Sequence, residues 1–234
     1  MRIALLGYGR MGKAIEQIAI NRGHEIVLKV DRKTKDYTFS NVDVAIDFSI
    51  PTTAYQNITD CINNNIPVVS GTTGWLEDYD KVVALCNEKK GAFIYGSNFS
   101  IGVNIFFELN AYLAKLMNGL SSYNVSMEEI HHTKKLDAPS GTAISLADGI
   151  IKNYDSKKSW VLESPAEEDI EITAKRIEDV PGTHTIFYKS EVDTLTISHE
   201  AHNRQGFALG AVLASEWLVG KTGVYTMKDV LNIK

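Results

Sequence analysis

The chain has 234 residues, of which 44% are hydrophobic and 23% charged, and its formal net charge is −5. This composition is typical of a globular protein with one large domain or two small ones, and its acidic balance argues against nucleic acid as a partner. The first residues read as a strand rather than as a basic leader, and no apolar run reaches the roughly 18 residues of a membrane span. We therefore expect a cytoplasmic protein that does not bind membranes.

The first hundred residues alternate between apolar strands and amphipathic helices. Strands are expected at 2–7, 24–32, 42–49, 66–74 and 91–100, and helices within 7–23, 52–65 and 76–90. Near-continuous apolar strands separated by helices predict an α/β fold, a doubly wound parallel sheet of the Rossmann type. Only ten residues, 32–41, separate the second strand from the third. Because a crossover helix needs about that many residues, we expect a short and mostly non-helical connection there.

The pattern changes after residue 100. Helices are expected at 101–120, at 140–154 with Ser140 as N-cap, and at 207–220; alternating strands are expected at 123–132, 159–163, 170–180, 182–190 and 193–201. Such strands predict a smaller α+β domain whose mixed or antiparallel sheet has one exposed or partner-facing side. We therefore expect residues 1–100 and 205–234 to form a dinucleotide-binding domain, and residues 101–204 to form a domain for substrate binding and oligomerisation.

The chain has two cysteines, Cys61 and Cys86, both within expected helices. Their separation fits neither a disulfide framework nor a zinc motif, so we interpret both as buried thiols.

The stretch GYGRMG places Gly7, Gly9 and Gly12 in the spacing GxGxxG between the first strand and the first helix. In dinucleotide-binding folds, the first glycine permits a tight turn, the second lets a pyrophosphate approach the backbone, and the third lets the helix pack on the strand. The alternative is that these glycines serve only the turn. Arg10 is a candidate contact of the pyrophosphate.

Asp31 ends the second expected strand, 19 residues after Gly12. A carboxylate at this place accepts hydrogen bonds from the adenosine ribose, whereas an arginine pairs with a 2′-phosphate. Arg32 follows directly, so the pair allows either NADH or NADPH as cofactor. The alternative for Arg32 is a solvated surface charge.

Two further loops follow the fourth and fifth strands and end at the same edge of the sheet, where ligands bind in doubly wound folds. Gly71, Thr72 and Thr73 belong to the first, and Ser97 and Asn98 to the second. We expect them near the nicotinamide half of the cofactor, with ordinary turns as the alternative.

The segment EEIHHTKKLDAPSGTA, residues 128–143, combines two histidines and two lysines with the start of a helix. Adjacent histidines on a strand point to opposite faces, and no further ligand has a zinc-like spacing, so we expect no metal. Cationic side chains beside a helix N-terminus can bind a small dianion and supply protons. These residues favour a reductase of a small acidic substrate.

This segment resembles the HHxxKxDAPSGTA signature of the dihydrodipicolinate reductase family, also called 4-hydroxy-tetrahydrodipicolinate reductases. GYGRMG, DFS after the third strand, GTTG at 71–74 and NFSIGVN at 98–104 also match this family, in order. The resemblance implies an NADH- or NADPH-dependent enzyme of lysine and diaminopimelate biosynthesis. It also implies a homotetramer whose core is formed by the sheets of the second domain.

The resemblance further implies roles for individual residues. His131 would be a proton donor or acceptor and Lys135 the proton donor. His132 would contact the substrate, and Gly141 with Thr142 would bind a substrate carboxylate. The residues that would line the cofactor are Gly7, Tyr8, Gly9, Arg10, Met11, Gly12, Asp31, Arg32, Gly71, Thr72, Thr73, Gly96, Ser97, Asn98 and Phe99.

Two rival functions share parts of this pattern. One is another two-domain NAD(P)-dependent dehydrogenase, which a panel of substrates would separate. The other is a non-catalytic NAD(H)-sensing protein, which would bind the cofactor without turning over any acid.

Overall fold

The computed structural model describes residues 1–34, 36–203 and 205–233. The chain divides into two compact units, one formed by Met1–Ile101 with Gln205–Lys234 and the other by Gly102–Arg204. Each unit has its own sheet and its own apolar core, and each is described separately.

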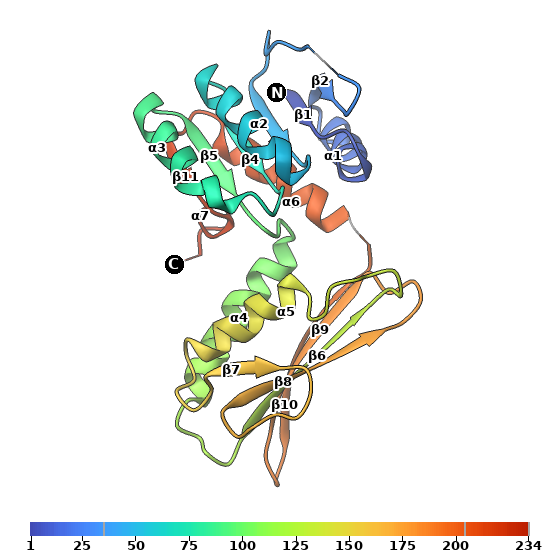
Figure 1. Ribbon diagram of the computed structural model, residues 1–234, viewed down its shortest axis with the longest axis vertical. Coiled ribbons are helices and arrows are strands. Elements are labelled where there is room, and N and C mark those ends of the chain that lie inside the picture. The colour runs from blue at the N-terminus through green and yellow to red at the C-terminus, as the bar shows by residue number, and fades with distance from the viewer. Residues whose placement is uncertain (35, 204, 234) are drawn as a thin grey trace. The chain divides into compact units, whose positions relative to one another are not determined.

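The first unit is built on a six-stranded parallel sheet in the order β11-β5-β4-β3-β1-β2 (Figure 1). Its strands are β1 (Arg2–Leu6), β2 (Glu25–Val30), β3 (Val44–Asp47), β4 (Val68–Ser70), β5 (Ala92–Tyr95) and β11 (Gly223–Tyr225). Its helices are α1 (Arg10–Asn21), α2 (Pro51–Asn63), the 3₁₀ turn η1 (Leu76–Asp78), α3 (Tyr79–Lys89), α6 (Gln205–Leu218) and α7 (Met227–Val230).

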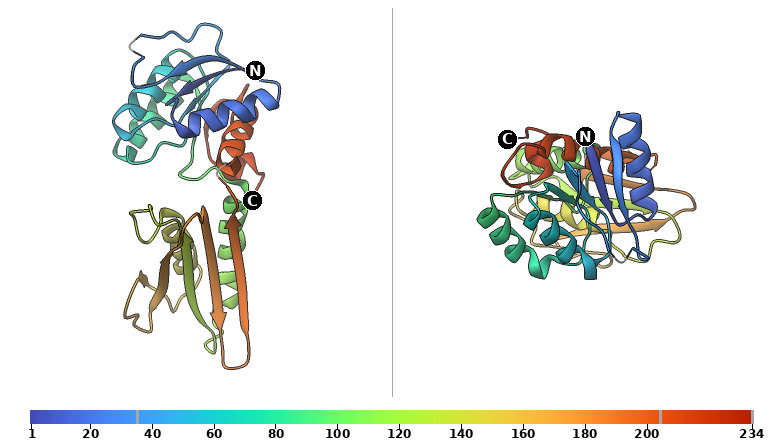
Figure 2. Two further views of the ribbon diagram at one scale, coloured as in Figure 1. Left: turned by 90° about the vertical axis from the view of Figure 1, so that its right-hand side faces the viewer. Right: turned by 90° about the horizontal axis from the view of Figure 1, so that it is seen from above.

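Helices cover both faces of this sheet, as Figure 2 shows. Helices α1 and α6 pack together on one face, and α2 and α3 pack together on the other. The central strands β1, β3 and β4 are almost fully buried, which explains their continuous apolar sequence. The doubly wound Rossmann-type sheet predicted from the sequence is confirmed, and the described part of residues 32–41 contains no helix, as expected.

Two elements near the C-terminus were not predicted from the sequence. Strand β11 adds a sixth strand beside β5, and the single-turn helix α7 follows it. Both are short, and neither shows a full period of the apolar alternation on which the prediction relied. Cys61 and Cys86 are free and buried, as predicted.

The second unit carries a mixed five-stranded sheet in the order β10-β9-β6-β8-β7. Its strands are β6 (Asn124–His131), β7 (Ser159–Val161), β8 (Asp169–Arg176), β9 (Gly182–Lys189) and β10 (Thr194–Ala201), and its helices are α4 (Ile101–Met117) and α5 (Gly141–Ile151). Strand β6 runs parallel to β8 and antiparallel to β9. The sheet is therefore mixed, which confirms the predicted α+β character.

Both helices of the second unit pack on one face of its sheet. From Val125 onward the residues of β6 alternate between buried and half-buried, and Val125 and Met127 join the apolar cluster beneath α4 and α5. The other face, which includes Ile130 and Phe187, is only partly covered. Among the described residues, none of the helices combines the length and hydrophobicity that a membrane span requires.

Candidate active site

The glycine loop between β1 and α1 has the geometry of a phosphate-binding turn. Gly7 has a φ of +97°, and a Cβ atom there would lie 2.2 Å from the carbonyl oxygen of Phe48. A Cβ atom on Gly12 would lie 2.7 Å from the carbonyl oxygen of Gly7, whereas one on Gly9 would meet no described atom within 4 Å. The loop therefore packs tightly below Gly7 and Gly12 and leaves its backbone open at Gly9, which fits a bound pyrophosphate.

Tyr8 lies within this loop, but its side chain is held by neighbouring elements. Its hydroxyl donates a hydrogen bond to Glu16 of α1, and the ammonium of Lys29 on β2 lies 5.0 Å from the centre of its ring. Glu16 also forms an ion pair with Lys29. Arg10 begins α1 and is exposed, and Met11 is half-buried.

Asp31 directly follows β2, at the position expected for a ribose-binding carboxylate. Its Oδ1 accepts hydrogen bonds from the backbone N–H groups of Lys33 (2.8 Å) and Thr34 (3.1 Å) and from the Thr34 hydroxyl (3.1 Å). The bond from Lys33 is the main cause of a lowered pKa, so the carboxylate is ionised at neutral pH. These three bonds all reach Oδ1, and both Asp31 and Arg32 are exposed.

A buried carboxylate, which was not among the residues predicted from the sequence, holds the loop after β4 in place. Asp47, at the end of β3, accepts hydrogen bonds from Asn57 Nδ2 (2.9 Å), Ser70 Oγ (2.8 Å) and Thr72 Oγ1 (2.7 Å). The Thr72 hydroxyl also accepts the backbone N–H of Ser49 at 2.8 Å. The hydroxyl of Thr72 is therefore engaged inside the protein, so this residue offers a cofactor its backbone rather than its side chain. Burial raises the pKa of Asp47.

The remaining predicted cofactor residues lie in two loops of the first unit. A Cβ atom on Gly71 would meet the Phe48 ring at 2.3 Å, and Thr73 is exposed. After β5, Gly96 donates its N–H to the Ser70 carbonyl oxygen at 3.1 Å, and Ser97 is exposed.

The next two residues of the β5 loop are turned toward the protein. Asn98 Oδ1 accepts the backbone N–H of Ser100 at 2.9 Å. The Phe99 ring is buried, with its centre 5.8 Å from that of Phe48. Phe99 therefore supports the loop from below.

In the second unit, the HHxxK segment spans the end of β6 and the loop before α5. His131 is the last residue of β6 and is buried, whereas His132 is half-buried. The Nδ1 atom of His132 is buried and has no hydrogen-bond partner among the described residues. Lys135 donates hydrogen bonds to both carboxylate oxygens of Asp137 at 2.9 and 2.8 Å. The loop thus contains an ammonium group paired with Asp137 and a buried imidazole nitrogen that has no partner among the described residues.

The N-terminus of α5 follows this loop in the chain and directs main-chain N–H donors outward from the helix. The Ser140 hydroxyl caps the helix by accepting the Ala143 N–H at 3.2 Å, as predicted. Gly141 and Thr142 form the first turn, and a Cβ atom on Gly141 would meet no described atom within 4 Å. The N-terminus of a helix favours anions, so this turn suits a carboxylate.

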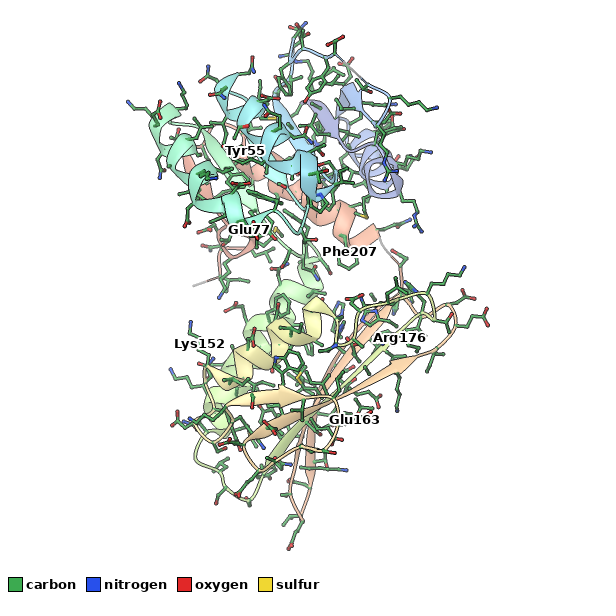
Figure 3. All side chains as sticks on the ribbon, viewed as in Figure 1. Tyr55, Glu77, Lys152, Glu163, Arg176 and Phe207 are labelled. Atoms are coloured by element: carbon green, nitrogen blue, oxygen red, sulfur yellow. The ribbon has the colours of Figure 1, made fainter. Side chains whose placement is uncertain are left out.

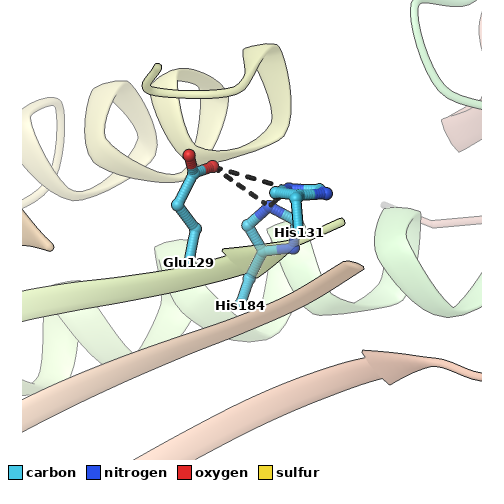
Figure 4. Close-up of side chains that lie close together, drawn as sticks. All are labelled: Glu129, His131 and His184. Carbon is cyan, nitrogen blue, oxygen red and sulfur yellow. Dashed lines mark hydrogen bonds and ion pairs between the residues drawn. The ribbon is translucent and has the colours of Figure 1, made fainter. Parts of the chain in front are cut away.

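A buried cluster beneath this segment was not foreseen. Figure 4 shows Glu129 and His131 of β6 with His184 of β9, whose ligand-type atoms all lie within 4.8 Å of one another. Arg176, labelled in Figure 3 at the end of β8, donates hydrogen bonds to Glu129 Oε1 at 3.3 and 3.4 Å. Strand alternation places Glu129 and His131 on one face, but nothing in the sequence gives the register that brings in His184 and Arg176.

The cluster shifts the protonation of its members. Burial would raise the pKa of Glu129, but hydrogen bonds from His131 and Ser140 outweigh that effect and lower the pKa to about 2. Burial, together with the nearby charges of His131 and Lys135, lowers the pKa of His184 to about 4. At neutral pH, a carboxylate and a neutral imidazole therefore face each other in the core of this unit.

Comparisons with known proteins cover almost the whole chain. The family profile described as "Dihydrodipicolinate reductase, N-terminus" matches residues 1–99, and "Dihydrodipicolinate reductase, C-terminus" matches residues 102–231. A 4-hydroxy-tetrahydrodipicolinate reductase from Christiangramia forsetii is 56% identical over 99% of this chain and 98% of its own length. One from Archaeoglobus fulgidus is 33% identical over 99% of this chain and 100% of its own length.

A solved structure shares the fold. The dipicolinate-bound dihydrodipicolinate reductase from Paenisporosarcina sp. TG-14 has a TM-score of 0.80 and 24% identity, and the match covers 100% of this chain and 99% of that one. On the two family profiles and the full-length relatives, the chain belongs to the dihydrodipicolinate reductase family.

Proposed function

We propose that this chain is a 4-hydroxy-tetrahydrodipicolinate reductase. It reduces (2S,4S)-4-hydroxy-2,3,4,5-tetrahydrodipicolinate to (S)-2,3,4,5-tetrahydrodipicolinate and releases water, in lysine biosynthesis through diaminopimelate. The observation that carries the proposal is the 56% identity over the full chain to a reductase of that name. The second unit supports it, because Lys135 and two histidines directly precede a capped helix N-terminus.

The cofactor is NADH or NADPH, and the first unit fits it. The open backbone at Gly9, the N-terminus of α1 and the ionised Asp31 are the groups that a dinucleotide's pyrophosphate and ribose require. When bound, the cofactor supplies a hydride, which makes the protein an oxidoreductase acting on a CH–CH group. We assign Gly7–Gly12, Asp31 and Arg32, Gly71–Thr73 and Gly96–Phe99 to its binding.

The protein groups act on the dicarboxylate substrate. Gly141 and Thr142, at the start of α5, bind one carboxylate, and His132 contacts the substrate. Negative charge develops on the substrate ring as it is reduced. Lys135 stabilises that charge and donates a proton, and His131 serves as the second proton-transfer group.

We further propose that the enzyme works in the cytoplasm as a homotetramer assembled through the second unit. Two surfaces of that unit support assembly. One is the half-covered face of its sheet. The other is a row of exposed apolar side chains along α4, spaced three or four residues apart, formed by Ile105, Leu109, Tyr112 and Leu116.

A coupled assay tests the reductase activity. The preceding synthase condenses pyruvate with aspartate semialdehyde, and loss of NADH or NADPH absorbance is followed after this protein is added. We expect oxidation that requires both substrates and the synthase, and the two cofactors can then be ranked. Well-folded protein that binds the cofactor but oxidises none of it would refute the proposed activity.

A further inference from the structure

Arg176 uses its guanidinium to join β6, β8 and the loop before α5. Its Nη2 donates to the carbonyl oxygen of Asp137 at 2.7 Å, and its Nη1 donates to the carbonyl oxygen of Lys175 at 2.8 Å. Both nitrogens also donate to Glu129 Oε1, at 3.3 and 3.4 Å. Four of the five N–H donors of the guanidinium are therefore engaged within the protein, so this side chain holds the fold around it rather than a ligand.

The register of the sheet places this guanidinium beside the loop that precedes α5. Arg176 is the last residue of β8 and lies opposite His131, the last residue of β6. Glu129 lies two residues earlier on β6, so all three side chains share one face of the sheet. Figure 3 shows Arg176 at this end of the sheet. The loop begins where both strands end, within reach of the arginine.

Polar contacts, rather than apolar packing, hold the middle of this loop. Leu136 is 97% exposed, and Asp137 is exposed as well. Arg176 holds the carbonyl oxygen of Asp137, and the Oε2 atom of Glu129 accepts the backbone N–H of Ser140 at 3.0 Å. One ion pair between neighbouring strands thus fixes the loop at two points of its backbone.

Each of these points lies next to a group that the proposed mechanism uses. The carboxylate of Asp137 holds the ammonium group of Lys135 at 2.9 and 2.8 Å, so the position of Asp137 sets that of the proton donor. Ser140 caps α5 and directly precedes Gly141 and Thr142, which are assigned to a substrate carboxylate. The ion pair therefore connects the proton donor with the turn that binds the substrate.

We propose that Arg176 is a positioning residue of the substrate site. Together with Glu129, it fixes the distance between Lys135 and the first turn of α5, so that a dicarboxylate bound at the turn meets the proton donor. The inference rests on the proposed function, which supplies the roles of Lys135 and of the turn. The role requires a planar fork that donates in two directions, which a lysine ammonium cannot replace.

The alternative is that Arg176 only neutralises Glu129. The side chain of Glu129 is 0% exposed, and although burial opposes its ionisation, hydrogen bonds lower its pKa to about 2. A buried carboxylate of this kind requires a cation nearby. Both roles predict damage when the arginine is removed. They differ for a lysine at this position, which keeps the charge but cannot reach Glu129 and the carbonyl oxygen of Asp137 together.

The first measurement therefore compares Arg176→Lys with the unaltered protein. Binding of dipicolinate, a planar dicarboxylate, is measured by calorimetry with NADH saturating, and kcat is measured in the coupled assay. We expect dipicolinate to bind about tenfold more weakly and kcat to fall about tenfold, because a charge-assisted hydrogen bond to the loop is lost. The Kd of NADH and the Tm should stay unchanged. Normal dipicolinate binding and normal kcat in this variant would overturn the proposal.

Arg22→Lys is the matched control. Arg22 donates two hydrogen bonds to the carboxylate of Glu216, at 2.7 and 2.8 Å, so the substitution removes the same kind of fork. Arg22 follows α1, at the opposite end of that helix from the glycine loop. This variant should keep normal turnover and normal dipicolinate binding.

The second measurement is chemical rescue of Arg176→Ala. The Arg176 side chain is 22% exposed, so a small cation can reach the space that this substitution leaves. We expect kcat to fall at least about tenfold and millimolar guanidinium chloride to restore much of it, whereas methylammonium chloride, which has the charge but no fork, should restore little. Equal rescue by the two cations, or none by guanidinium, would contradict the proposal. Arg176→Lys carries the test if Arg176→Ala does not fold.

The outcomes separate this inference from the proposed function. Weaker dipicolinate binding by Arg176→Lys, in a protein without reductase activity, would support the inference and refute the function. An active reductase whose kcat and dipicolinate binding are the same in Arg176→Lys would support the function and refute the inference. Unaltered protein with neither reductase activity nor dipicolinate binding would refute both.

Discussion

Lys135 lies in the loop between β6 and α5, where Asp137 holds its ammonium group. Its neighbour Lys134 is exposed. If Lys135 is the proton donor, Lys135→Ala should lower kcat by about 10²- to 10⁴-fold, the usual contribution of a positioned general acid. The coupled assay measures this, and Lys134→Ala should keep normal turnover. Near-normal kcat in Lys135→Ala would remove the residue from the mechanism.

His184 makes stability depend on pH, and the sign follows from its pKa. The pKa falls from 6.5 in the unfolded chain to about 4 in the folded one, so acid protonates the unfolded state first. The contribution of His184 to the free energy of unfolding is therefore fully present above pH 6.5. It is lost as the pH falls toward 4, and amounts to about 3 kcal/mol. Urea unfolding at a series of pH values measures this. The free energy of unfolding should depend less steeply on pH in His184→Gln than in the unaltered protein.

The control for this experiment is His202→Gln, because His202 is exposed and should leave the slope unchanged. Glu129 acts in a lower window, since its contribution is lost as the pH falls from 4.5 toward 2. A slope between pH 7 and 4.5 that is identical in His184→Gln and the unaltered protein would show that folding does not lower the pKa of His184.

At the scale of single elements, the end of α3 carries local strain. Lys90 follows the helix with a φ of +52°, a left-handed conformation that favours glycine. Lys90→Gly should therefore raise the free energy of unfolding by about 0.5–1 kcal/mol. Urea unfolding measures the gain. Lys89→Gly, one residue earlier and helical, should lower stability instead, and a loss in both variants would contradict this explanation.

The elements also show what the sequence could predict. The glycine loop, strands β1 to β5 of the first sheet and the Ser140 cap follow from local spacing and residue type, so they were predicted correctly. The Asp47 network and the cluster of Glu129 with His184 depend on which residues face each other across strands. That register is a tertiary property, and no local pattern of the sequence encodes it.

At the scale of the whole molecule, the half-covered sheet face of the second unit supports the proposed tetramer. Phe187 lies on that face, between Ser126 of β6 and Thr196 of β10. A charge there should be costly once a partner covers it, so Phe187→Asp should shift the protein toward smaller species in sedimentation velocity. Lys152→Asp, on the exposed end of α5, should not. An unchanged sedimentation coefficient for Phe187→Asp would exclude this face from the assembly.

The first unit is completed only by the last thirty residues of the chain. Helix α6 supplies Ala208, Val212 and Leu218 to the core beneath α1, and β11 pairs with β5, more than a hundred residues earlier. During translation, the first unit therefore stays incomplete while the second unit emerges and folds. The edge of β5 is uncovered during that time. An unpaired strand edge is a site of aggregation. The demand for chaperones should accordingly be greatest until Gly223–Tyr225 have emerged from the ribosome and cover that edge.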